Sequence, residues 1–287
     1  MRYQISHQTT YNYSQTVRLK PHIIRLCPRS DRFTQVQQFS LLVQPQPQGT
    51  SELIDLDGNN LIKLWFEQPT TKLQIQILSQ VETLCSNPFN YLLEPWAITI
   101  PFDYPLSWYR QLHSYLQPYG LVRDAVALEL AQQIQLETNN NTLNFLFTLN
   151  QQIYQECQYI VRETGAPWAA GITWKRKQGS CRDYSVLFME VARSVGIPAR
   201  FVSGYQEGDP DMSNRDLHGW VEVYLPGGGW RGYDPTLGLV VSDRHIPLVA
   251  SAIPQETAPI LGAVTPVDYE QHVTSNMDTQ IAIALLK

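Results

Sequence analysis

The sequence predicts an α+β protein in which an N-terminal β-sandwich-like domain precedes a domain of helices packed on an antiparallel sheet. Short stretches of alternating polarity fill residues 1–85, stretches with helical spacing begin near residue 122, and further strand-like runs follow residue 198. The chain has 287 residues, of which 43% are hydrophobic, so it is long enough to build more than one core.

Residues 1–85 show the two-residue period of β-strands. Thr71 to Ile77 alternate strictly between polar and apolar, so Leu73, Ile75 and Ile77 are expected on one face. The dipeptide Asp57-Gly58 separates two apolar runs and predicts a hairpin turn. Further short strands are expected at 2–7, 9–13, 17–26 and 36–43. Short strands separated by polar turns are typical of a small sandwich or barrel-like module.

Residues 86–120 form a connecting segment that is rich in proline and aromatic residues. The segment lacks the Gly/Ser composition of a flexible linker, and we therefore expect it to wrap over the domain that follows. That domain is expected to span residues 121–287. It starts with helices predicted at 122–137 and 142–158, and a third helix begins at Cys181 and ends before Gly196-Ile197-Pro198. Strands are then expected at 199–205, 217–225 and 229–233, with a closing strand at 280–286.

Composition excludes several classes of partner. The 26 acidic residues outnumber the 21 basic ones, so we expect no nucleic-acid or anionic-membrane partner. The sequence shows no apolar signal core and no run approaching the roughly 20 apolar residues of a membrane span, which favours the cytoplasm. The four cysteines are too few and too irregularly spaced for a disulfide framework, and we expect no metal and no cofactor.

A cysteine stands at the predicted start of the third helix. Cys181 follows Gly179-Ser180, and the apolar residues after it recur with helical spacing. Unpaired backbone N–H groups and the positive end of the helix dipole lie at such a position, and both stabilise a thiolate. Because the thiolate attacks carbonyl carbon, Cys181 is the candidate nucleophile; the alternative is a buried, inert cysteine.

His218 and Asp234 follow Cys181 on predicted strands. The order Cys, His, Asp predicts a nucleophile, a general base and an orienting carboxylate. The alternative for His218 is a strand histidine that makes only a structural hydrogen bond. The alternative for Asp234 is an aspartate that only forms the turn before Pro235. The same side chains could also hold zinc, but a cysteine at a helix start favours the nucleophile.

Four ordered blocks carry a family resemblance. They are the run Gly179-Ser180-Cys181-Arg182-Asp183-Tyr184 and residues 196–205, 218–227 and 229–236. Together they resemble the papain-type transglutaminase-like superfamily, and within it the bacterial branch described as candidate cysteine proteases. Residues 3–13 and 25–29 look like the β domain that precedes the catalytic core in that branch. The resemblance implies a papain-like, transglutaminase-like core; a departure is that residues 239–261 lack a Gly-Arg-Asp-Tyr run found in relatives.

The resemblance implies a cysteine-dependent acyl-transfer enzyme that acts on peptide or carboxamide bonds of a protein or peptide substrate. Cys181, His218 and Asp234 would form its catalytic triad and an acyl-enzyme its intermediate. We favour hydrolysis, as in a cysteine protease or amidase, because the sequence shows no obvious calcium loop and resembles the bacterial branch. The alternatives are a protein-glutamine transglutaminase and a non-catalytic binding or scaffold protein with the same fold.

Residues near the candidate triad are expected to line the cleft or to complete an oxyanion hole. The backbone N–H of Cys181 is the expected first donor, and Trp174, Gln178 and Tyr184 are candidates for the second. Trp220 shares a strand face with His218, so it either lines the cleft or fills the core.

The sequence leaves the oligomeric state open. Other cysteines and histidines are expected to have no catalytic role: Cys27, Cys85, Cys157, His7, His22, His113, His245 and His272.

Overall fold

The computed structural model describes residues 1–162, 165–208, 217–268 and 272–286. The N-terminal strands are β1 (Arg2–Leu19), β2 (His22–Ile24), β3 (Thr34–Gln44), β4 (Gly49–Ile54), β5 (Asn60–Trp65) and β6 (Thr70–Thr83). The central elements are α1 (Leu106–Leu112), α2 (Ala125–Glu137), α3 (Thr142–Glu156), β7 (Gln158–Tyr159), α4 (Ala170–Arg176), β8 (Gln178–Gly179) and α5 (Cys181–Ser194). The later strands are β9 (Ala199–Gln206), β10 (His218–Leu225), β11 (Gly229–Asp234), β12 (Leu239–Val240), β13 (His245–Ser251), β14 (Ile260–Leu261), β15 (Val264–Pro266) and β16 (Ser275–Leu286).

The N-terminal strands form packed sheets with a shared core. One sheet has the strand order β15-β1-β6-β3 with β16 also paired to β1, and the other has the order β14-β2-β5-β4. Ile5 of β1, Leu64 of β5 and Ile75 of β6 are fully buried in the same cluster. The predicted sandwich is therefore confirmed, as is the buried face of Leu73, Ile75 and Ile77. Residues 2–19, expected as separate short strands, form the single strand β1.

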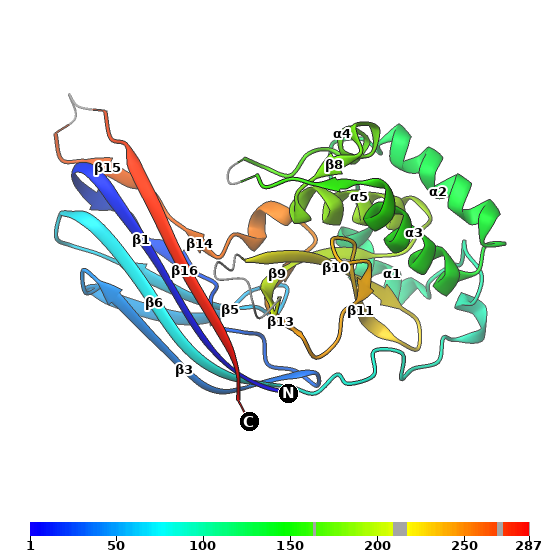
Figure 1. The fold of residues 1–287 in the computed structure, drawn as a ribbon, viewed down its shortest axis with the longest axis horizontal. Coiled ribbons are helices and arrows are strands. Elements are labelled where there is room, and N and C mark those ends of the chain that lie inside the picture. The colour runs from blue at the N-terminus through cyan, green and yellow to red at the C-terminus, as the bar shows by residue number, and fades with distance from the viewer. Residues whose placement is uncertain (163–164, 209–216, 269–271, 287) are drawn as a thin grey trace.

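The C-terminal residues return to this sandwich, which corrects the assignment of the whole of 121–287 to one domain. β16 runs antiparallel to β1, with Leu286 opposite Arg2 and Ser275 opposite Tyr13. β15 pairs with the end of β1, and β14 pairs with β2. Figure 1 shows β16 beside β1, with the N- and C-termini close together. The expected closing strand at 280–286 thus begins earlier and completes the N-terminal sheet, because β1 offers it a long, continuous partner.

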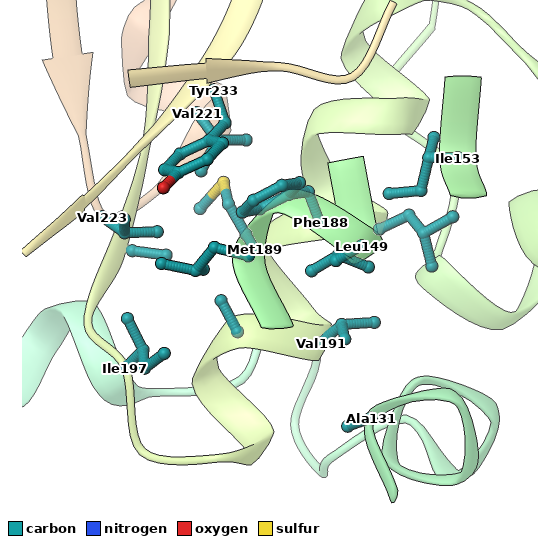
Figure 2. Close-up of a cluster of buried hydrophobic side chains, with 14 of the residues drawn as sticks. Ala131, Leu149, Ile153, Phe188, Met189, Val191, Ile197, Val221, Val223 and Tyr233 are labelled. Atoms are coloured by element: carbon teal, nitrogen blue, oxygen red, sulfur yellow. The ribbon is translucent and has the colours of Figure 1, made fainter. Parts of the chain in front are cut away.

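The second domain consists of helices on an antiparallel sheet with the strand order β12-β11-β10-β9-β13. Helix α5 lies between this sheet and the other helices (Figure 1). In Figure 2, Phe188 and Met189 of α5 lie between Val221 and Val223 of β10 on one side and Leu149 of α3 on the other. All these side chains are fully buried, so α5 is the central element of the core.

The same sheet also contacts the N-terminal sandwich. Tyr205 of β9 and Ile246 of β13 are buried in the sandwich cluster with Ile5. The Tyr205 hydroxyl is also hydrogen-bonded to His7 Nδ1 of β1, at 2.9 Å. The sheet of β9 to β13 is therefore supported by helices on one side and by the sandwich.

The connecting segment wraps over the second domain, as expected. Ile100 is buried in the helix–sheet core. The Glu94 N–H donates to the Pro226 carbonyl at 3.0 Å, and the Tyr104 hydroxyl donates to the Tyr224 carbonyl at 3.1 Å. The described part of the chain contains no helix that is both long and apolar enough to cross a membrane.

Candidate active site

Cys181 is the first residue of α5. Ser180 precedes it as the N-cap residue in extended conformation, and Asp183 completes a capping box with Ser180. The first-turn N–H groups of a helix have no intrahelical partner, so this end of α5 favours negative charge. Cys181 is 9% exposed, so its thiol lies just below the surface.

A buried carboxylate fixes the start of α5. Asp183 Oδ2 accepts hydrogen bonds from the N–H and the hydroxyl of Ser180, both at 2.8 Å. Its Oδ1 accepts from the Trp168 N–H at 2.7 Å and from Arg162 at 2.5 Å. Burial alone would raise the pKa of Asp183, but these hydrogen bonds outweigh it and hold the pKa below its usual value. Asp183 thus joins the start of α5 to the loop before α4.

The side chains of His218 and Asp234 lie within ion-pair distance of each other. His218 is the first residue of β10, and Asp234 is the last residue of the neighbouring strand β11. His218 Nε2 lies 2.7 Å from Asp234 Oδ2, and the carboxylate is fully buried. This contact leaves His218 Nδ1 for another partner, and the Cys181 side chain lies close enough to the same imidazole to raise its pKa. The structure therefore brings together the three residues of the predicted triad.

The surroundings set the charges of this pair. Burial alone lowers the pKa of His218, but the Asp234 carboxylate, followed by Cys181, raises the pKa to about 10. Burial would likewise raise the pKa of Asp234, yet His218 and then His245 hold it well below its usual range. At pH values between the pKa of Asp234 and that of His218, the site therefore contains an imidazolium next to a carboxylate.

Backbone amides and a second histidine complete the contacts of Asp234. The N–H groups of Thr236 and Leu237 donate to Oδ1 at 3.0 Å and 3.3 Å. His245 Nε2 lies 3.1 Å from Oδ2. Asp234 is thus both a turn residue and a site residue: Oδ1 binds the amides of the turn after Pro235, and Oδ2 contacts the two histidines. Sequence reasoning missed His245, although it begins a strand shortly after the aspartate block.

Two of the four candidate cleft residues are enclosed by protein. Tyr184 is 1% exposed inside the helix–sheet core, with its ring edge against Tyr159. Trp220 is 0% exposed and clusters with Val202 and Ala250. Tyr184 therefore fills the helix–sheet core, and Trp220 packs within the sheet, beside the cavity that it lines with His245.

Trp174 and Gln178 lie near the surface before α5. Trp174 is half-buried and packs against the helix–sheet core, and the Lys177 ammonium lies over its ring at 2.8 Å from the centroid. Gln178 is half-buried in β8, next to Gly179 and close in sequence to Cys181. Both stay predictions for the cleft. Within the described ranges, no group of three or more His, Cys, Asp or Glu side chains has a geometry that could hold a metal ion.

Comparison with known proteins identifies relatives for both parts of the chain. Residues 3–82 match the bacterial transglutaminase-like N-terminal region, and residues 129–235 match the transglutaminase-like superfamily. An uncharacterized Mycobacterium leprae protein is 26% identical over 301 residues, covering 99% of this chain and 99% of that protein. A protein-glutamine gamma-glutamyltransferase of Pseudomonas aeruginosa is 36% identical over 80 residues, covering 25% of this chain and 12% of that protein.

One solved structure shares the complete fold. It is a Cytophaga hutchinsonii protein described as a candidate cysteine protease, with a TM-score of 0.71 and 20% sequence identity. The alignment covers 100% of this chain and 92% of that chain. The sandwich and the helix–sheet domain therefore occur together in that structure, in the same overall arrangement.

Proposed function

We propose that this chain, which belongs to the transglutaminase-like superfamily, is a cysteine-dependent acyl-transfer enzyme. Cys181 is the nucleophile, His218 the general acid and base, and Asp234 the orienting carboxylate. The observation that carries the proposal is the position of the His218 imidazole, which is 2.7 Å from the buried Asp234 carboxylate and has Cys181 near enough to raise its pKa. A structural histidine needs neither a thiol partner nor a buried anion.

The first half-reaction follows from this geometry. The Cys181 thiolate attacks the carbonyl carbon of a peptide or carboxamide bond, and a carbon–sulfur bond forms as the carbonyl oxygen becomes an oxyanion. The His218 imidazolium gives its proton to the leaving nitrogen, the carbon–nitrogen bond breaks, and an amine or ammonia departs. A thioester on Cys181 remains. Asp234 stabilises the imidazolium and keeps Nδ1 directed at the thiol.

The oxyanion requires hydrogen-bond donors next to Cys181. The Cys181 N–H belongs to the first turn of α5, where amides lack intrahelical partners, and we assign it as the first donor. Gln178 is the preferred second donor because its side chain is half-buried in β8, close to the start of α5. Its replacement by Glu keeps the size of the side chain but removes the N–H donors, and typical losses for one such donor are about 10²–10³-fold in kcat.

Water is the proposed acceptor in the second half-reaction. His218 takes a proton from water, the resulting hydroxide attacks the thioester, and the carbon–sulfur bond breaks to release a carboxylic acid and the thiol. The proposed substrate is a protein or peptide. Transfer to an amine is the alternative, and the 36% identity to a protein-glutamine gamma-glutamyltransferase over 80 residues favours it. The triad serves both outcomes.

Selective alkylation tests the nucleophile. Cys157 is a matched control because both it and Cys181 are 9% exposed, and burial raises the pKa of Cys157 to about 11. Iodoacetamide at pH 6 should modify Cys181 at least tenfold faster than Cys157, as measured by mass spectrometry of digested protein. The advantage should disappear in His218→Ala. Equal, slow modification of both cysteines in the wild-type protein contradicts the proposal and leaves a binding or scaffold role.

The acceptor is tested with a glutamine-containing peptide and a fluorescent primary amine in H₂¹⁸O. Hydrolysis incorporates ¹⁸O into the product carboxylate, whereas transfer attaches the amine to the peptide. Cys181→Ala is the control and should abolish both products. Amine attachment that exceeds ¹⁸O incorporation at millimolar amine would replace the hydrolytic proposal by transamidation.

A further inference from the structure

Two imidazoles share one oxygen of the candidate catalytic aspartate. His218 Nε2 and His245 Nε2 lie 2.7 Å and 3.1 Å from Asp234 Oδ2. An ionised carboxylate only accepts hydrogen bonds, so each Nε2 must carry a hydrogen. His245 begins β13, and its side chain is 2% exposed. The carboxylate is therefore held by side chains from different strands.

The second nitrogen of His245 has a different environment. His245 Nδ1 is buried and has no hydrogen-bond partner among the described residues, and the same holds for Trp220 Nε1. The Trp220 ring lies edge-on to His245, with centroids 5.3 Å apart, and 6.3 Å from His218. Trp220 and His245 both line a cavity of about 60 Å³ between the sheet and the N-terminal domain. Both nitrogens are enclosed by protein atoms rather than exposed to that cavity.

We propose that His245 is a positioning residue, which donates its Nε2–H to Asp234 Oδ2 and thereby holds the carboxylate ionised and oriented toward His218. The proposal rests on the proposed function of the Cys181–His218 pair. The backbone amides of Thr236 and Leu237 hold Oδ1 in place. Without His245, His218 would be the one hydrogen-bond partner of Oδ2 among the described residues. A carboxylate that loses a donor becomes easier to protonate, and it is also freer to rotate.

The tautomer follows from the same contacts. With the hydrogen on Nε2, the neutral form of the His245 imidazole carries its lone pair on Nδ1. The titratable groups that face His245 are Asp234 of β11, His218 of β10 and the other residues that line the cavity: Asp31, Cys85, Glu222 and Arg231. Asp234 is the group that His245 contacts directly, so the support that Asp234 gives to the His218 imidazolium is what loss of His245 should weaken.

The pH dependence of Cys181 alkylation tests this role. The rate should fall on the acid side as the Cys181–His218 pair takes up a proton, and a weaker Asp234 counter-ion should let this happen at higher pH. His245→Leu should move this acid limb upward by about one pH unit, which means alkylation about tenfold slower at a pH on that limb. His245→Gln retains an N–H donor and should restore most of the rate. His22→Leu removes an equally buried imidazole from the sandwich and should leave the limb unchanged.

The outcomes separate this proposal from the proposed function. If wild-type Cys181 reacts no faster than Cys157, the nucleophile assignment fails. If wild-type Cys181 is selective but His245→Leu has the wild-type acid limb, or His22→Leu moves it equally, the role of His245 is overturned and the nucleophile stands.

A measurement on the wild-type protein covers the case in which His245→Leu does not fold. NMR of ¹⁵N-histidine-labelled protein reports which ring nitrogen carries hydrogen, and the His245 signals are assigned by their loss in His245→Gln. A protonated Nε2 with an unprotonated Nδ1 near neutral pH is expected. Hydrogen on Nδ1 with a bare Nε2 would overturn the proposal, because that tautomer cannot donate to Asp234.

Discussion

Asn59 pairs with Ala250 in both directions. Its Nδ2 donates to the Ala250 carbonyl at 2.8 Å, and its Oδ1 accepts from the Ala250 N–H at 2.9 Å. Asn59 is fully buried and precedes β5 of the sandwich, whereas Ala250 belongs to β13 of the second domain's sheet. A single side chain therefore joins the N-terminal domain to the strand that begins with His245.

This contact predicts a large effect of Asn59→Ala on stability. The substitution leaves the buried N–H and carbonyl of Ala250 unpaired, which should lower the free energy of unfolding by about 3 kcal/mol. Asn87→Ala is the control, since Asn87 is exposed and binds only a local backbone N–H. Urea denaturation of both variants measures the difference. Equal, small losses would show that the Asn59 contact contributes little.

Asp183→Ala should destabilise the start of α5 more than the loss of an ordinary helix cap. Asp183 is fully buried and binds Ser180, Trp168 and Arg162, so the substitution leaves an uncompensated guanidinium and should cost about 3–5 kcal/mol. Asn141→Ala removes the N-cap hydrogen bond of α3 and should cost about 1 kcal/mol. Thermal and urea unfolding compare the two variants, and similar losses would contradict a special role of Asp183.

His218 should make stability depend on alkaline pH. Its pKa is raised from 6.5 to about 10 in the folded protein, so its stabilising contribution is complete below pH 6.5 and is lost as pH rises toward 10. The difference in unfolding free energy between wild type and His218→Gln should therefore shrink by a few kcal/mol across this range. Denaturant titrations at pH 6, 8 and 10 measure it. A difference that stays constant with pH would argue against the ion pair with Asp234.

His7 should make stability depend on acidic pH. Burial lowers the pKa of His7 to about 4, so the unfolded chain binds a proton that the folded protein excludes between pH 6.5 and 4. Its contribution is complete above pH 6.5 and falls by about 3 kcal/mol toward pH 4. His7→Gln should flatten this part of the pH profile, whereas His113→Gln, at an exposed position, should retain it because His7 is intact. Identical profiles for wild type and His7→Gln would contradict this origin.

Local signals in the sequence predict much of the fold and the first component of the site. The alternation of Leu73, Ile75 and Ile77 predicted their buried face, and Gly196 ends α5 with a positive φ of 84°. The Gly-Ser-Cys run predicted a cysteine at a helix start, which the structure contains. Such signals can be read because capping, turns and strand periodicity depend on residues within a few positions of one another.

Contacts between distant residues were decided only by the tertiary structure. β16 returns to pair with β1 from the other end of the chain, and Trp220, which could have lined a cleft, is buried in the core. His245 has no sequence block that assigns it a role, yet it shares Asp234 with His218. The sequence by itself determined the order of Cys181, His218 and Asp234. Their approach, and the second histidine behind them, depended on strand pairing and burial, which have no local signature.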